Sequence, residues 1–204
     1  MARDKSIPED IKKHILNEYF VAIQTFFNTS GGFKLSKKNL KMLFYAAFSE
    51  DLVIKKESIP ALHLMQKDLI ALLSATYQAF INGSIEMIPE PDEAFINGLP
   101  RQELYCGLIL EDVVSAWNYY PRHLNKEEFV NPSIFFGKFF EYKKVIEWKT
   151  VFEELFYAAL VHESVIGFSD AIDNVIQMYD YSFKFLEISH IIKVRHDYQL
   201  PQRP

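Results

Sequence analysis

The pentapeptide LFYAA occurs twice in this chain, at Leu43–Ala47 and again at Leu155–Ala159. Around each copy, apolar residues recur at the spacing i, i+3, i+4, i+7 and i+8, which is typical of a helix with one buried face. This stripe begins at Leu40 in the first copy and at Phe152 in the second. The repeat therefore predicts two equivalent helices, and the alanine pair in each predicts close approach by a neighbouring helix.

Two origins of the repeat are open. Both copies continue to Val-Ile at the same offset, and a five-residue identity with shared flanks favours duplication of an ancestral segment. The alternative is convergence of two unrelated segments on one favourable packing solution.

Composition favours a helical protein. The chain has 204 residues, of which 49% are hydrophobic and 24% charged, as in soluble globular proteins. It contains seven Gly and nine Pro, which is few for a β-sandwich that turns after every strand. We therefore expect an all-α bundle of about seven to eight helices.

Start and stop signals divide the chain. Pro8, followed by two acidic residues, predicts the start of a first helix that NTSGG ends, and Pro60 with Asn82–Gly83 bounds a second secure helix. Residues 138–148 are open between helix and strand, with helix favoured. We expect an N-terminal helical half at 1–83, an acidic proline-containing connection at 84–100 and a C-terminal helical half at 101–204, and the halves can pack as one domain.

Charge is divided unevenly. Residues 1–102 hold 12 Lys/Arg and 12 Asp/Glu, whereas residues 103–204 hold 10 and 15, so the formal charge of −5 lies in the second half. An acidic balance disfavours nucleic acid at long range. No uncharged apolar run reaches the ~18 residues of a membrane helix. With Cys106 as the single cysteine and no leader, we expect a cytoplasmic protein.

Residues that carry catalytic or metal chemistry are sparse. Glu187 and His190 have the Glu-x-x-His spacing of di-iron bundles, but the sequence has no second copy of that motif, so they are weak metal candidates. His14 and Glu18 have the spacing of a surface pair. Cys106 has apolar neighbours, as an inert packing thiol does. The adjacent residues of His162–Ser164 point in different directions on a helix, so they predict no catalytic relay. From these residues together we expect neither an enzyme nor a cofactor.

Two features suggest partners. The aromatic run SIFFGKFF is too apolar for a helix with one solvent face, so either some rings are presented to a partner or the helix is buried on all sides. The candidate rings are Phe135, Phe136, Phe139 and Phe140. Basic residues near the start of the first repeat helix and near the C-terminus are candidates for phosphate contact, although solvated charge is the commoner explanation. These are Lys37, Lys38, Lys41, Lys193 and Arg195.

The string SKKNLKMLFYAA, and less closely WKTVFEELFYAAL, resembles a helix-opening motif of RteC-type regulators of Bacteroides conjugative transposons. The similarity covers about a dozen residues per copy, all at core positions, so it transfers no functional residue. It implies a helical protein with a DNA-associated regulatory role.

Three functions follow from these patterns. The leading hypothesis is a non-enzymatic bacterial regulatory or protein–protein interaction module, which could self-associate, and whose acidic second half selects a basic partner. The alternatives are a DNA-binding transcription or excision regulator of a mobile element and a helical metal-binding protein.

Overall fold

The fold is helical throughout the part of the chain that the computed structural model describes, namely residues 7–48, 54–55, 58–88, 123–161 and 175–199. The α-helices are α1 (Glu9–Thr29), α2 (Phe33–Phe48), α3 (Ile59–Ile81), α5 (Lys126–Val130), α6 (Pro132–Tyr142), α7 (Val145–Val161) and α8 (Val175–Gln199), with a 3-10 turn η2 (Ile85–Met87). These ranges contain no strand, and the predicted all-α bundle is confirmed. None of the described helices has the length and apolar character needed to cross a membrane.

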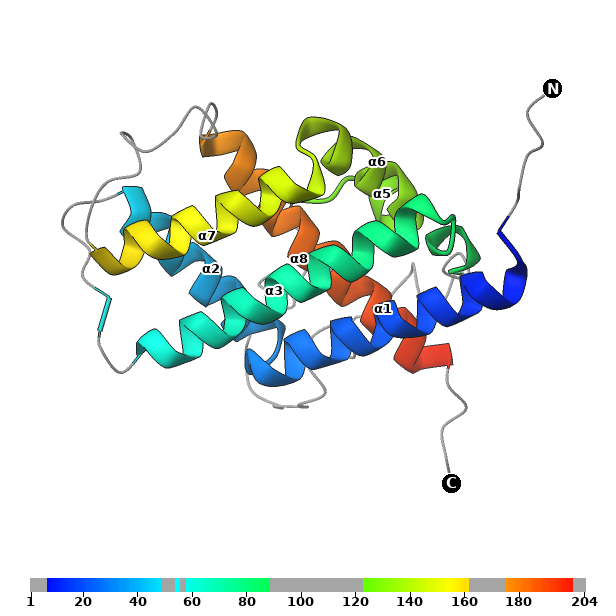
Figure 1. The fold of residues 1–204 in the computed structure, drawn as a ribbon, viewed down its shortest axis with the longest axis horizontal. Helices are drawn as coiled ribbons and strands as arrows, with labels where there is room; N and C mark the ends of the chain where they lie inside the picture. The colour runs from blue at the N-terminus through cyan, green and yellow to red at the C-terminus, as the bar shows by residue number, and fades with distance from the viewer. Residues whose placement is uncertain (1–6, 49–53, 56–57, 89–122, 162–174, 200–204) are drawn as a thin grey trace.

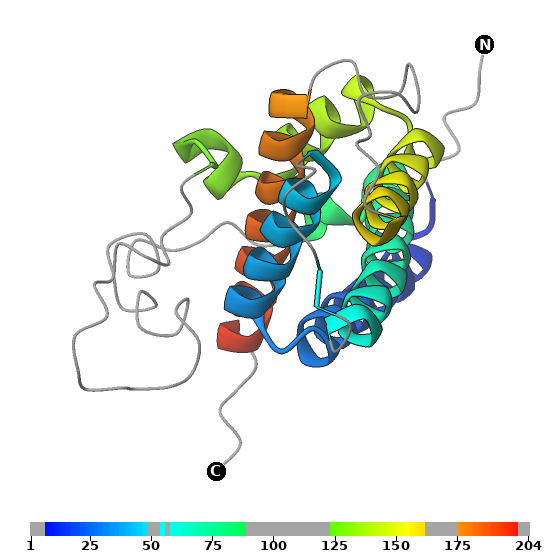
Figure 2. The ribbon, with the colours of Figure 1, turned by 90° about the vertical axis from the view of Figure 1, so that its left-hand side faces the viewer.

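The helices form two layers. In one layer α1, α3 and α7 lie side by side and alternate in direction (Figure 1). In the other, α2 and α8 run antiparallel, which Figure 2 shows from the end of the molecule. The short elements η2, α5 and α6 close one end of the bundle.

The predicted ends of the first helices are confirmed. Glu9 and Asp10 lie in the first turn of α1, where their charge opposes the positive end of the helix dipole. After α1 the chain turns through Gly31 and Gly32, whose φ angles of 77° and 86° are ones that side chains with a Cβ rarely adopt. Gly83 follows α3 with a φ of 66°.

Residues 138–148 are helical on both sides of a break. Helix α6 ends at Tyr142, Lys143 is extended, and α7 begins at Val145. The break is fixed by Trp148, which is fully buried and stacks on the ring of Phe139 with centroids 4.4 Å apart. Its indole N–H also donates to the carbonyl of Phe139 at 3.1 Å. Helix was therefore the better of the two interpretations.

The two copies of the repeat are buried in the same pattern. Position by position, residues 40–48 and 152–160 share one sequence of buried, half-buried and exposed side chains. All four alanines of the pairs are at most 2% exposed, and α2 packs directly on α7. The tyrosine that precedes each alanine pair points outward in both copies, with Tyr45 53% and Tyr157 55% exposed. The small side chains are therefore buried, as expected for positions at a helix contact.

The copies are also joined crosswise. The ring of Phe44 on α2 meets Tyr179 of α8 with centroids 5.2 Å apart, and Phe156 on α7 meets His63 of α3 at 5.5 Å. Each repeat helix thus packs on the long helix that follows the other copy. Duplication stays a prediction, because a shared pattern of burial also follows from a shared pattern of sequence.

One hydrophobic cluster contains side chains from both predicted halves, from Tyr19 on α1 to Ile192 on α8. Several predictions fall outside the described residues. These are most of the connection at 84–100, Cys106 and His162–Ser164.

Enlarging the alanines tests the close contact of α2 with α7. Ala47→Leu and Ala159→Leu should each lower the free energy of unfolding by about 1–3 kcal/mol, because added methyl groups overpack a filled contact. Ala71 on α3 is exposed, so Ala71→Leu should stay within about 0.5 kcal/mol of wild type. Urea denaturation measures all three, and equal effects would contradict the proposed contact.

Alkaline unfolding tests the burial of Tyr19. Complete burial raises the pKa of its phenol. The stabilisation by the neutral phenol is therefore full below the unfolded-state pKa of about 10 and is lost as pH rises toward the folded-state pKa. Between about pH 9 and pH 11.5, the free energy of unfolding should fall less for Tyr19→Phe than for wild type. Tyr45→Phe, at an exposed ring, is the control and should follow wild type.

Candidate functional site

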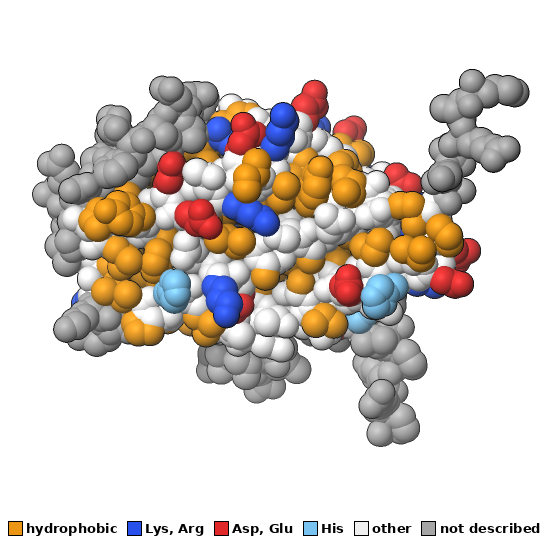
Figure 3. Space-filling model, viewed as in Figure 1, with side chains coloured by type: hydrophobic (Ala, Val, Ile, Leu, Met, Phe, Trp, Pro, Cys, Tyr) orange, Lys and Arg blue, Asp and Glu red, His pale blue; other side chains and the backbone are white. Residues whose placement is uncertain are grey.

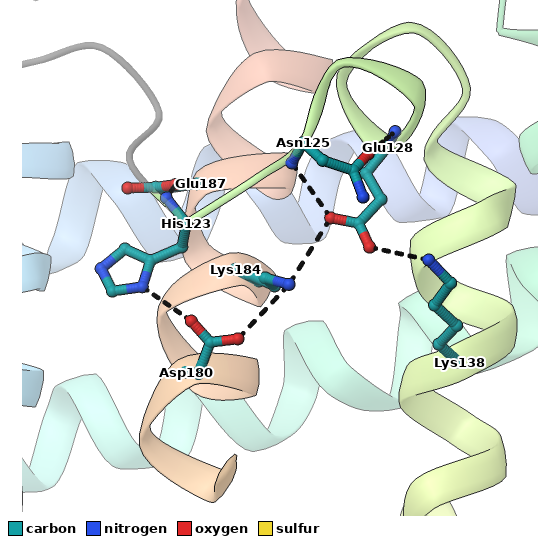
Figure 4. Close-up of polar contacts among 7 residues, drawn as sticks. All are labelled: His123, Asn125, Glu128, Lys138, Asp180, Lys184 and Glu187. Atoms are coloured by element: carbon teal, nitrogen blue, oxygen red, sulfur yellow. Dashed lines mark hydrogen bonds and ion pairs between the residues drawn. The ribbon is translucent and has the colours of Figure 1, made fainter. Parts of the chain in front are cut away.

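A polar cluster ties the chain before α6 to helix α8 (Figure 4). Its members come from residues 123–128, from α6 and from α8. They are His123, Asn125, Glu128, Lys138, Asp180, Lys184 and Glu187. These residues are far apart in sequence, and none but Glu187 was a candidate from sequence.

Glu187 is a buried member of this cluster and contacts two other parts of the chain. Its side chain is 1% exposed, and one carboxylate oxygen accepts a hydrogen bond from Lys37 Nζ at 2.8 Å. The other oxygen accepts from the backbone N–H of His123 at 3.0 Å. One carboxylate thus joins α2, α8 and the segment before α5. A buried carboxylate needs such partners, because isolated charge is costly away from water.

His123 and Asp180 form a second contact in the cluster. The imidazole Nδ1 lies 3.0 Å from an Asp180 oxygen, and the other Asp180 oxygen lies 3.3 Å from Lys184 Nζ. The ring also stacks on Phe183, with centroids 5.3 Å apart. A carboxylate that orients an imidazole occurs in acid–base sites, but there the imidazole also faces a nucleophile or substrate. Here the observed contacts fix the ring to α8, so we interpret the pair as an anchor.

Glu128 closes the cluster. Its side chain is 2% exposed and pairs with Lys138 at 3.1 Å and Lys184 at 3.6 Å. It also completes a capping box with Asn125 at the start of α5. The charges of the cluster are therefore directed at one another and at helix ends, which indicates a structural role.

The candidate metal ligands lie on one helix but face different partners. The carboxylate of Glu187 is held by Lys37, whereas His190 stacks on Phe33 with centroids 4.3 Å apart. Within the described ranges, no three His, Cys, Asp or Glu side chains gather as a metal site requires. His14 and Glu18 form an exposed pair at 3.3 Å, as their spacing predicted.

The aromatic run on α6 lies in the core. Phe135, Phe136 and Phe139 are each 0% exposed, and Phe140 packs half-buried against Tyr77 and Phe80. The rings are covered because α6 packs on α3, and because Phe136 and Phe139 contact Phe185 of α8. The prediction that they are presented to a partner is corrected: this helix is buried, which was the other interpretation of the run.

The basic candidates on α2 share one face. Lys38 and Lys41 are exposed, with Lys41 Nζ 5.3 Å from the ring centre of Tyr45. Lys37 is turned toward α8 and pairs with Glu187. Lys34, which was not among the candidates predicted from the sequence, adds a fourth lysine to the same face.

The basic candidates on α8 do not add to that face. Arg195 is 2% exposed and donates to the carbonyls of Val130, at 3.1 Å, and Phe129 at the end of α5. It therefore satisfies carbonyls at a helix end, where a cation is favoured. Lys193 pairs with Asp197 one turn further along α8.

A further surface, which we call the acidic–apolar face, was not predicted from the sequence. It consists of Leu64 on α3 and Glu153, Tyr157 and Val161 on α7. The three hydrophobic side chains are 44%, 55% and 39% exposed, and Figure 3 shows hydrophobic side chains gathered over the end of α7 and the start of α3, with acidic ones beside them. The sequence does contain a sign of this surface, because Tyr157 lies outside the buried apolar stripe of its helix.

Comparison with known proteins adds no relative. No family model, curated protein or solved structure matches this chain. The resemblance to RteC-type regulators therefore rests on its short motif alone.

Substitution at the Lys37–Glu187 pair tests the anchor. Lys37→Met should lower the free energy of unfolding by roughly 1–3 kcal/mol, because it removes the cation beside a buried carboxylate. Adding Glu187→Gln removes that charge and should recover part of the loss. A double-mutant cycle by urea denaturation measures the coupling, and purely additive losses would contradict it.

Proposed function

We propose that the chain is a non-enzymatic interaction module and that its contact surface is the acidic–apolar face. The proposal rests on one observation, the exposure of the hydrophobic side chains of Leu64, Tyr157 and Val161 on two helices that pack on each other. Exposed aromatic and aliphatic side chains of this kind provide much of the binding energy at protein interfaces.

The charge on this face supports a basic partner. Glu153 is exposed one turn before Tyr157, and α7 carries three glutamates against one lysine. Opposite charge around a hydrophobic centre speeds association and selects among partners. By contrast, the charged groups of the cluster in Figure 4 are directed at one another. We propose that the module acts in the cytoplasm as a bacterial regulator.

Binding of DNA is the second candidate function. The four lysines on one face of α2, which has no acidic residue, support it. A salt-dependent shift with duplex DNA that weakens in Lys38→Glu/Lys41→Glu would favour this candidate. No binding at low salt would remove it.

Partner capture with matched variants tests the leading proposal. Leu64→Asp places a charge in the acidic–apolar face, whereas Val21→Asp makes the same kind of change at an exposed position of α1. In affinity purification from the native host with quantitative mass spectrometry, Leu64→Asp should lose a basic protein at least about tenfold, which corresponds to 1.4 kcal/mol. Val21→Asp should retain it. Identical protein profiles for the two variants and wild type would contradict the proposal.

A further inference from the structure

The outer face of α2 combines positive charge with an exposed aromatic ring. Lys38 and Lys41 are exposed, and within the described residues neither forms an ion pair, whereas the neighbouring Lys37 is held by Glu187. Tyr45 follows Lys41 by one turn and is also exposed, with Lys41 Nζ 5.3 Å from its ring centre. Helix α2 itself contains no acidic residue. This face therefore offers two cations and a flat ring to the solvent.

Helix α8, which packs beside α2, adds a phenol to this face (Figure 2). Lys41 and Tyr45 lie close enough to the phenol of Tyr179 to influence its pKa, which burial raises above its usual value. The phenol therefore stays protonated at neutral pH and can donate a hydrogen bond. Asp180, the next residue on α8, is already engaged by an imidazole and an ammonium group of the polar cluster in Figure 4.

We infer that Lys38, Lys41, Tyr45 and Tyr179, which we call the lysine–tyrosine face, bind single-stranded nucleic acid. A base stacks on the ring of Tyr45, and the two lysines contact neighbouring phosphates, to which the phenol of Tyr179 also donates. Proteins that bind single strands combine cations that follow the backbone with aromatic side chains on which bases stack. The lysine–tyrosine face shares no residue with the acidic–apolar face, so the two surfaces can be tested separately.

The exposed ring selects this ligand among polyanions. Bases in a duplex are stacked on one another, so a single strand is the form of nucleic acid that offers a base to Tyr45. An acidic peptide can pair with the lysines but has no base to stack. The formal charge of −5 repels all of these polyanions at long range and does not discriminate among them. Stacking does not depend on net charge, and it therefore favours the single strand.

The second copy of the repeat provides a matched control. Tyr157 on α7 occupies the place of Tyr45 and is equally exposed. Glu153 and Thr150, however, stand where α2 has its two exposed lysines. Tyr157 therefore presents the same ring without the cations, and we expect it to make no contact with the strand.

Fluorescence polarisation with a dye-labelled oligodeoxythymidine of about 12 nucleotides tests the contribution of the lysines. Wild type should bind at about 20 mM NaCl, where screening is weak. Lys38→Gln/Lys41→Gln should bind more weakly, and its plot of log binding constant against log salt should be shallower by about 1.4, which corresponds to two phosphate contacts on a single strand. Lys12→Gln/Lys13→Gln makes the same change of net charge on α1 and should behave as wild type does.

The same measurement tests the ring. Tyr45→Ala should weaken binding at least about fivefold, which is the size of one base–ring stack, and should leave the salt dependence unchanged. Tyr45→Phe keeps the ring and should retain the affinity of wild type. Tyr157→Ala and Leu64→Asp should also bind as wild type does. Circular dichroism confirms that each variant is folded.

Four results would overturn the inference. The first is no binding of the oligonucleotide at low salt with up to about 100 µM protein, the weak end of non-specific affinity. The second is equal binding by Tyr45→Ala and wild type, which would leave charge alone as the cause. The third is displacement of the strand by duplex DNA at an equal concentration of phosphate, which assigns the lysines to duplex binding. The fourth is equal displacement by polyglutamate, which assigns them to an acidic protein.

Discussion

The contact between the two LFYAA helices is the constraint on which the rest of the structure depends. The alanine pairs of α2 and α7 are buried and these two helices pack on each other, while Phe44 and Phe156 each reach the long helix that follows the other copy. Helices from both ends of the chain are thereby held around one core. Close packing of this kind leaves little room for change, since interiors are as dense as organic crystals.

Much of this fold was readable from the sequence because helical periodicity and end signals are local. The apolar stripe beginning at Leu40, the turn through Gly31 and the stop at Gly83 all depend on neighbouring residues. The burial of Phe135, Phe136 and Phe139 was not readable, because an all-round apolar helix is equally consistent with a core and with a partner surface. Only the packing of α6 on other elements decides between them.

The polar cluster was unpredictable for a related reason. Glu187 meets Lys37 and the backbone of His123 across long sequence separations, and no spacing rule connects such residues. The same contacts explain why the Glu-x-x-His motif was misleading as a metal signal: the carboxylate balances a lysine. Arg195 likewise looked like part of a basic patch, although it is buried against the end of α5.

Nuclear Overhauser spectroscopy on selectively labelled protein tests the crosswise packing most directly. The account predicts cross-peaks between the ring protons of Phe44 and Tyr179 and between those of Phe156 and His63, whose ring centroids are 5.2 and 5.5 Å apart. Observation of both contacts would establish that each repeat helix packs on the helix following the other copy. The absence of either cross-peak from otherwise well-resolved spectra would contradict it.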